Sequence, residues 1–266
     1  MAIVINDKNI QSINTLTSLC PETFPYVPLR IYKDDDGQCY ATIQTSDINQ
    51  SVVFSGKVKF ENDISALKPG DEAIIRLPLS KQITGILFNS AFDTLEINKT
   101  KIVAKGSNKR ITISLYDTPG ETPKSKIPYV NTELLEMSLS KRGISKIPMT
   151  QMMLNPDKIK EMMECMSILM NPENIIFSST GEDIVITCED VARNSIEYKM
   201  NEPSNEIFSS KFVIAADKIP MSIVKVMQKL SRYKDFNVDM LLCELMAAFT
   251  ISNDNVVATI GIPAAQ

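Results

Sequence analysis

A proline-rich segment near the middle of the chain sets the strongest limit on how it can fold. Asp117 to Tyr129 (DTPGETPKSKIPY) holds three prolines, one glycine and no hydrophobic periodicity. Proline lacks a backbone donor and breaks helices, so this segment has the character of a linker between domains. Because it divides the 266 residues nearly in half, we predict an N-terminal domain at 1–116, a connector at 117–131 and a C-terminal domain at 132–266.

The two halves repeat one order of elements: helix, strands, helix, strands. Helical periodicity covers about Asn6 to Leu19, Leu79 to Asn89, Pro156 to Met170 and Lys218 to Tyr233. Strand patterns with turn residues between them predict the remaining elements: Leu29–Lys33, Cys39–Thr45, Ser51–Phe60, Ala73–Leu77, Thr94–Ile97, Lys101–Lys105, Arg110–Tyr116, Glu133–Leu139, Asn174–Ser178, Asp183–Glu189, Ser195–Met200, Phe208–Ala215, Val238–Leu242, Leu245–Ile251 and Val256–Ile262. The predicted fold class is α+β, with an internal duplication of architecture.

Composition removes much catalytic chemistry. The chain has no histidine, so it cannot form a Ser-His-Asp or Cys-His nucleophile pair, nor a His-ligated zinc site. It also lacks the G-x-x-x-x-G-K-[ST] phosphate loop and the G-x-G-x-x-G dinucleotide fingerprint. We therefore predict a protein that is not an enzyme, with no catalytic residues and no cofactor.

Metal binding is also not expected. The five cysteines (Cys20, Cys39, Cys165, Cys188 and Cys243) contain no C-x-x-C pair, and reduced, mostly buried thiols are the better interpretation. Asp34-Asp35-Asp36-Gly37 is read as a hairpin turn, because adjacent carboxylates on a hairpin tip rarely converge on one ion. The sequence shows no signal peptide and no apolar run long enough to cross a membrane, which predicts a cytoplasmic protein, in the host cytoplasm if it is viral.

The distribution of charge along the chain is more informative than the net charge of -4, which by itself argues against nucleic-acid binding. On the helix near the C-terminal end, an apolar sector contains Ile219, Ile223, Val226, Met227 and Leu230. The opposite side contains only cations, and no acidic residue lies between Lys218 and Lys234. This face is either an ordinary solvated surface or one that presents cations to phosphates. The predicted phosphate-facing set is Lys218, Lys225, Lys229 and Arg232, with Lys8, Lys81, Lys158 and Lys160 on the other helices.

Several segments in both halves resemble the sliding DNA clamps, the processivity factors of replicative polymerases. They are Leu77–Leu87 (LPLSKQITGIL), Lys126–Pro128, Leu154–Lys160, Ile175–Glu189 (IIFSSTGEDIVITCE) and Lys211–Ile219 (KFVIAADKI). The pattern is most similar to the clamp subunit of T-even-type bacteriophages. The resemblance covers nearly the whole chain and rests on element order rather than on a short motif.

The resemblance implies an architecture and a set of partners. Each clamp-type domain would pack two helices on antiparallel sheets, with the helices lining a central hole that holds duplex DNA without sequence preference. Two-domain subunits of this family form a closed homotrimer by head-to-tail contacts. A clamp-loader ATPase would open the ring, and a DNA polymerase would dock in a hydrophobic pocket near the connector. The resemblance places that pocket near Ile127, Tyr129, Ile260, Ile262 and Pro263.

Two other classes of function fit the same sequence. A structural or adaptor protein of a virion or an assembly scaffold would have the same β-rich composition, and its basic helix would be an ordinary surface. An unrecognised hydrolase or transferase has no positive support. The number of subunits and the sign of charge on the helices distinguish these alternatives.

Overall fold

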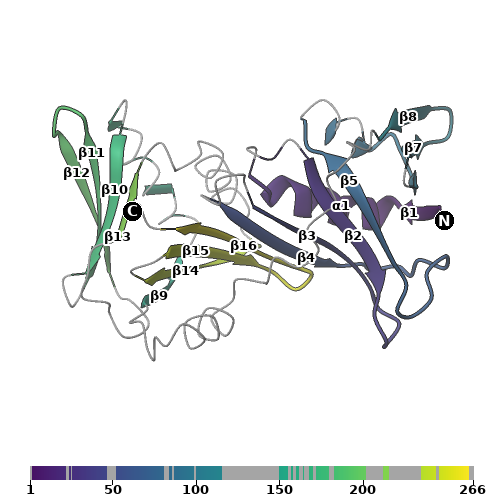
Figure 1. Ribbon diagram of the computed structural model, residues 1–266, viewed down its shortest axis with the longest axis horizontal. Helices are drawn as coiled ribbons and strands as arrows, with labels where there is room; N and C mark the ends of the chain where they lie inside the picture. Colours follow the sequence, from purple (N-terminus) through teal and green to yellow (C-terminus); the bar gives the residue numbers. More distant parts are fainter. Residues whose placement is uncertain are drawn as a thin grey trace. The chain divides into compact units, whose positions relative to one another are not determined.

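The computed structural model describes residues 2–21, 24, 26–46, 52–80, 84–85, 87–98, 100–115, 150–154, 157, 160–161, 164, 168–169, 172–179, 183–201, 212–215, 235–243 and 246–263. The described chain is rich in strands (Figure 1). Among these residues, no helix combines the length and the apolar composition that crossing a bilayer requires.

The first helix forms where the sequence predicted it. β1 (Ile3–Asn6) leads directly into α1 (Asp7–Leu19). The Asn6 side chain caps the helix by accepting a hydrogen bond from the backbone N–H of Asn9 at 3.2 Å, and Asp7 complements the helix dipole. The apolar stripe, from Ile10 to Leu19, is buried, and α1 packs on β1 and β6 (Thr94–Ile97).

The strands of the N-terminal half belong to two sheets. One is a four-stranded antiparallel sheet in the order β1-β6-β7-β8, with β7 at Lys101–Lys105 and β8 at Arg110–Ser114. The other strands are β2 (Tyr26–Lys33), β3 (Cys39–Ser46), β4 (Val53–Lys59) and β5 (Glu72–Pro78), in the order β5-β2-β3-β4.

The acidic run between β2 and β3 is a turn, as predicted. Gly37 has a φ of 83°, which glycine adopts without strain, and its N–H donates to the Asp34 carbonyl at 3.1 Å. The Asp34 carboxylate accepts from the backbone N–H of Gln38 at 2.7 Å. At least one of these carboxylates therefore stabilises the turn itself.

The C-terminal half repeats the two-sheet arrangement. One sheet has the order β12-β11-β10-β13, formed by β10 (Pro172–Ser179), β11 (Asp183–Asp190), β12 (Ser195–Asn201) and β13 (Phe212–Ala215). The other strands are β9 (Thr150–Leu154), β14 (Asn237–Cys243), β15 (Met246–Ser252) and β16 (Val256–Pro263). They continue the hydrogen-bonded order as β5-β2-β3-β4-β16-β15-β14-β9.

The chain forms two compact units, and each includes short segments from the other half of the sequence. The first contains Met1–Thr45, Ser55–Ile127 and Asp254–Ala258. The second contains Ser46–Phe54, Pro128–Asn253 and Thr259–Gln266. Residues 116–149, which include the predicted connector, lie outside the described residues, so the predicted domain boundaries stay a prediction.

Three of the predicted helices lie partly or wholly outside the described residues. Within the second, the backbone N–H of Thr84 donates to the Ser80 carbonyl at 2.9 Å, and Leu87 is buried. Within the third, Asp157, Lys160, Glu161, Glu164 and Ile168 are helical. The fourth, which carries the four firmest basic residues, is not among the described residues.

Candidate nucleic-acid and assembly interface

The outward face of α1 is polar and nearly neutral. Lys8, Gln11 and Asn14 are exposed, and the hydroxyl groups of Ser12, Thr15 and Ser18 donate to carbonyls of their own helix. Such a face lets a polyanion approach without repulsion, and it provides few charges that would hold the polyanion in place.

The ion pairs of the two described candidate lysines lie at the surface. Lys8 Nζ is 3.2 Å from Glu61 Oε2, and the two side chains are 60% and 51% exposed. Lys160 Nζ is 3.8 Å from Glu164 Oε1, with both side chains about two-thirds exposed. Exposed pairs contribute little free energy, so a phosphate could replace either carboxylate. Lys81, Lys158, Lys218, Lys225, Lys229 and Arg232 lie outside the described residues, and the phosphate-facing set stays a prediction.

The proposed docking residues fall into two groups. Ile127 and Tyr129 lie outside the described residues, and Pro263 ends β16. Ile260 and Ile262 on β16 are only 1% and 2% exposed, so their side chains are core side chains of the chain itself. Their role in docking stays a prediction, and a partner could reach them only after neighbouring side chains move.

Among the described residues, the strand order reveals a feature that the sequence pattern did not: each four-stranded sheet ends in an exposed edge strand. β8 is the last strand of its sheet, and none of its five residues is fully buried. β12 is the last strand of the other sheet, and its residues Ser195 to Lys199 are likewise exposed or half-buried. Unpaired backbone groups on an edge strand are a template for pairing with another chain.

The hydrogen-bond pattern shows which residues of β8 face this open edge. In the β7–β8 ladder, Gly106 N–H donates to the Lys109 carbonyl at 2.9 Å and Leu115 N–H to the Thr100 carbonyl at 2.7 Å. Antiparallel residues alternate between those that bond to the partner strand and those that point away. Arg110, Thr112 and Ser114 therefore direct their backbone N–H and C=O groups away from β7.

The same reasoning applies to β12. Asp190 N–H donates to the Asn194 carbonyl at 3.0 Å, which sets the alternation of the β11–β12 ladder. Ser195, Glu197 and Lys199 therefore direct their backbone groups away from β11.

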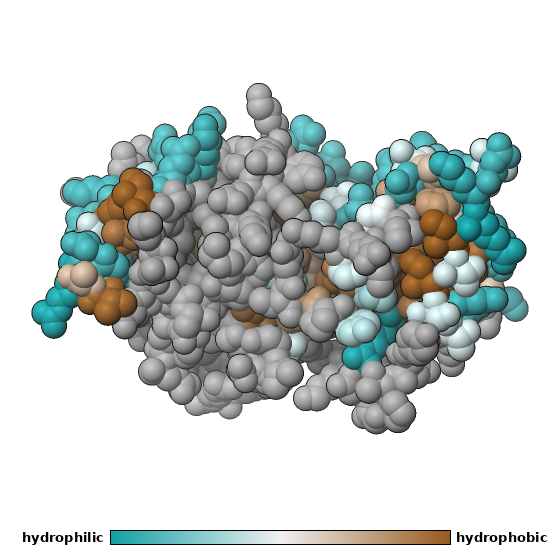
Figure 2. Space-filling view, turned by 90° about the horizontal axis from the view of Figure 1, so that it is seen from above, coloured by the Kyte–Doolittle hydropathy of each residue, from teal (hydrophilic) through white to brown (hydrophobic). Residues whose placement is uncertain are grey.

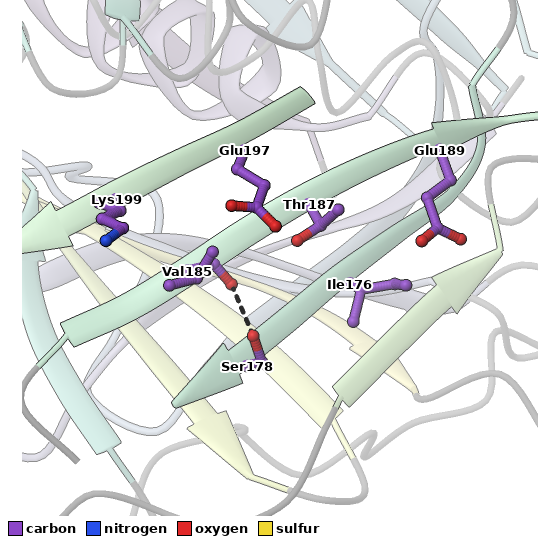
Figure 3. A pocket seen from close by; sticks show the side chains of 7 residues that line it. All are labelled: Ile176, Ser178, Val185, Thr187, Glu189, Glu197 and Lys199. Atoms are coloured by element: carbon purple, nitrogen blue, oxygen red, sulfur yellow. Dashed lines mark hydrogen bonds between the residues drawn. The ribbon is translucent and has the colours of Figure 1, made fainter. Parts of the chain in front are cut away.

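A hollow of about 350 Å³ lies on one face of the β10–β11–β12 sheet (Figure 3). The Ser178 hydroxyl donates to the Val185 carbonyl at 3.4 Å, and Glu189, Glu197 and Lys199 are the charged side chains that line the hollow (Figure 3). The lining residues are Ile176, Ser178, Val185, Thr187, Glu189, Glu197 and Lys199. Within the described part of the chain, no group of three or more Cys, Asp or Glu side chains is placed to hold a metal ion.

One described cysteine has a polar environment. Cys39 Sγ donates to Asp63 Oδ1 at 3.3 Å, and Lys33 Nζ lies 2.7 Å from the same oxygen. Burial raises the pKa of the Cys39 thiol, which disfavours the thiolate that nucleophilic chemistry requires. The hydrogen bonds from Lys33 and then Cys39 lower the pKa of Asp63. Cys20, Cys39 and Cys188 are buried, as the sequence predicted for most of the cysteines.

Exposed apolar side chains are scattered in the described part of the surface. Val4, Met153, Ile168 and Val191 are the most exposed of them, at 54% to 77%. In Figure 2, the coloured surface shows hydrophilic side chains interspersed with small hydrophobic groups. Single exposed apolar residues are normal, so none of these is assigned a function.

Comparison with solved structures reveals the fold. PCNA from Thermococcus kodakaraensis aligns over 98% of this chain and 99% of its own, with a TM-score of 0.62 and 13% identity. The DNA polymerase sliding clamp from Caulobacter crescentus aligns over all of this chain, with a TM-score of 0.66 and 11% identity. The chain has the DNA clamp fold.

The DNA polymerase sliding clamp from Bacillus subtilis is similar to the same degree, with a TM-score of 0.64 and 13% identity. This chain spans 64% of that clamp and 65% of the Caulobacter clamp, so it is about two-thirds as long as the bacterial chains. No family model and no curated protein matches the sequence. The predicted α+β fold class with clamp-type domains is confirmed.

Proposed function

We propose that this chain is the subunit of a sliding clamp that encircles duplex DNA and tethers a replicative DNA polymerase. The observation that carries the proposal is the alignment with an archaeal PCNA over 98% of this chain and 99% of that one. A likeness over nearly the whole of both chains fits a clamp subunit better than a single shared domain. The role is binding rather than catalysis, in agreement with the absence of histidine.

The helices would face the DNA. α1 contributes a polar face with Lys8 on it, and the remaining phosphate contacts would come from Lys81, Lys158, Lys160, Lys218, Lys225, Lys229 and Arg232. Contacts to phosphates alone are independent of base sequence and weaken with salt, which suits a ring that slides. Topological closure would then supply processivity.

Assembly into a ring would use the open edges. β8 and β12 are different surfaces, so their pairing between copies is head-to-tail, and such contacts close into a ring when the rotation permits. We propose a homotrimer, which the resemblance to phage-type clamps implies for a two-domain subunit. A clamp-loader ATPase would open it, and the polymerase would dock near Ile127, Tyr129 and the end of β16.

The first test of the proposal is the mass of the particle in solution. Size-exclusion chromatography with light scattering should give about three times the 29.7 kDa of the chain. A particle that stays monomeric across the micromolar range would contradict the clamp proposal and favour the structural or adaptor alternative.

The second test reverses the charge of the fourth helix. Lys225→Glu, Lys229→Glu and Arg232→Glu together should abolish retention on duplex DNA at moderate salt while the particle mass stays the same, because each phosphate contact contributes to the salt-sensitive affinity. The matched control makes the same three reversals at the exposed residues Lys59, Lys68 and Lys101, away from the helices. Equal retention by both triple variants would remove the fourth helix from the DNA-facing set.

A further inference from the structure

We propose that Glu61 is a positioning residue for the DNA contact of α1: its carboxylate holds Lys8, and a DNA phosphate must displace it before Lys8 binds the phosphate. The inference rests on the proposed function, in which α1 faces the duplex, and it adds a residue that sets the strength of that contact. Its chemical basis is that carboxylate and phosphate oxygens are both anionic acceptors for an ammonium group, so each competes with the other.

Lys8 is the only basic residue of α1, whose sequence is DKNIQSINTLTSL. From Gln11 onward, the exposed and half-buried side chains of this helix are amides and hydroxyl groups. Neutral donors bind a phosphate less strongly than an ammonium group does, so the charge-dependent part of a contact at α1 comes from Lys8. A residue that neutralises Lys8 therefore controls how strongly this helix holds DNA.

The position of Glu61 is fixed by the residue that follows it. Asn9 is 1% exposed, and its side-chain amide exchanges two hydrogen bonds with the backbone N–H and carbonyl of Asn62. This buried contact joins the first turn of α1 to the loop after β4, and it brings the two preceding residues together. Lys8 Nζ lies 3.2 Å from Glu61 Oε2. The carboxylate is thus held beside the ammonium group by a tertiary contact.

The ion pair between Lys160 and Glu164 requires no such anchor. Its two residues are four positions apart on one helix, and the Nζ and Oε1 atoms are 3.8 Å apart. Any helix brings side chains at this spacing together, so that pair by itself says nothing about regulation. Lys8 and Glu61 lie far apart in the sequence, and the fold has to place them side by side.

The pair of Lys8 and Glu61 is strong enough to compete with DNA and weak enough to exchange. The two side chains are 60% and 51% exposed, so solvent screens their attraction. An exposed pair of this kind shifts an equilibrium by roughly fivefold at most. A phosphate that approaches α1 can therefore replace the carboxylate, and the loss of the internal pair subtracts from the affinity that is gained. A contact of this kind suits a ring that slides, because no phosphate is held tightly.

Glu61 should also change the dependence of DNA binding on salt. A lysine that binds a phosphate releases a condensed cation from the DNA. The carboxylate set free from Lys8 attracts a cation in return, so the net release at this contact is small. Without the carboxylate, each contact between Lys8 and a phosphate should steepen the slope of log K against log salt by up to about 0.9.

The experiment compares Glu61→Gln with the unmodified chain for binding to a short linear duplex, onto which a ring can thread from the end. Fluorescence anisotropy of the labelled duplex, measured from low salt upward in potassium chloride, gives the affinity and its salt slope together. Glu61→Gln should tighten binding at low salt roughly twofold to fivefold for each Lys8 in contact, and it should steepen the slope. The particle mass should stay the same.

Glu72→Gln is the matched control, because it removes the same charge from an ion pair of similar exposure on a sheet. Glu72 Oε2 lies 2.6 Å from Arg30 Nη2, and both side chains are 48% exposed. This variant should leave the affinity and the slope as they are. A second control repeats Glu61→Gln in a Lys8→Gln background, where it should no longer steepen the slope, because Glu61 acts through Lys8.

The outcomes distinguish this inference from the proposed function. An unmodified chain that binds the duplex with the same affinity and slope as Glu61→Gln would overturn the role of Glu61 while the clamp stands. The same follows if Glu72→Gln, or Glu61→Gln without Lys8, reproduces the full effect, because the change would then come from net charge alone. A chain that binds no duplex at any salt concentration, with or without the substitutions, would overturn both.

Discussion

At the scale of single residues, Asn9 connects α1 to the loop after β4. It is 1% exposed, its Nδ2 donates to the Asn62 carbonyl at 2.8 Å, and its Oδ1 accepts from the Asn62 N–H at 3.2 Å. Asn9→Ala would leave both backbone groups without a partner, and we expect a loss of about 3 kcal/mol in the free energy of unfolding. Urea unfolding checks this, with the exposed Asn14→Ala as the control on the same helix. Equal stability of the two variants would mean that water replaces the Asn9 side chain.

Acid stability should depend on Asp63. Hydrogen bonds from Lys33 and Cys39 lower its folded pKa, so the stabilisation is present above the unfolded value, about 3.9, and is lost as pH falls through the folded value. The pKa of Lys33 is raised by the same bond, so at the alkaline end the contribution is lost only above about pH 10.

Asp63→Asn should therefore lower the thermal midpoint at pH 7 and flatten its fall between about pH 4 and pH 2. Thermal melts across this range measure both effects, with the exposed Asp254→Asn as the control. A variant that keeps the full acid dependence of the unmodified chain would contradict the assignment.

At the scale of elements, Gly106 positions the β7–β8 hairpin and with it the open edge. A Cβ built at this residue would lie well inside contact distance of the Ala91 carbonyl oxygen, which is backbone and has little room to move. Gly106→Ala should cost about 3 kcal/mol and should also weaken association, because β8 must shift. Gly85→Ala is the control, since Gly85 is helical and open space surrounds it. Hydrogen exchange of β8 amides reports the displacement.

Elements whose pattern is local were predictable from the sequence, and those set by distant partners were not. α1 follows from Asn6 as a cap and from its apolar spacing, and the turn at Asp34–Gly37 follows from turn chemistry. β9 was not predicted, because Thr150 is the one β-branched residue in Thr150–Leu154 and the segment has no aromatic residue. Its pairing with β14 decides its state.

The DNA-facing residues of the candidate site stay a prediction, because most of them lie outside the described residues. A helical wheel can predict a basic helix face from the sequence alone. The open edges at β8 and β12 could not be found this way, because strand order and backbone alternation depend on which strands pair. The sequence could not predict the burial of Ile260 and Ile262 for the same reason. Their alternation with small residues along β16 does not show which face of the sheet other elements cover.

At the scale of the whole molecule, net charge is a poor guide to function. A chain of net charge -4 could enclose DNA if its cations gathered on helices lining a central hole, and an acidic outer surface would then discourage wrapping by DNA. What distinguishes a clamp from an ordinary DNA-binding protein is then topology rather than affinity. A decisive test must distinguish retention of the protein on DNA by charge contacts from retention by closure of the ring around the DNA.

A ring locked by disulfides at its joints makes this separation. One such variant carries Thr112→Cys on β8 and Ser195→Cys on β12, one on each of the open edges proposed to join the copies. Mixed with nicked circular plasmid and then oxidised, it should yield rings that stay on the plasmid in high salt and detergent, because no contact is then needed to hold them. Cutting the plasmid once with a restriction enzyme should release them. Gel filtration of the plasmid before and after cutting measures the retained protein, and oxidation before DNA is added gives the control. Locked rings that never remain on circular DNA, or that remain after it is cut, would contradict encirclement.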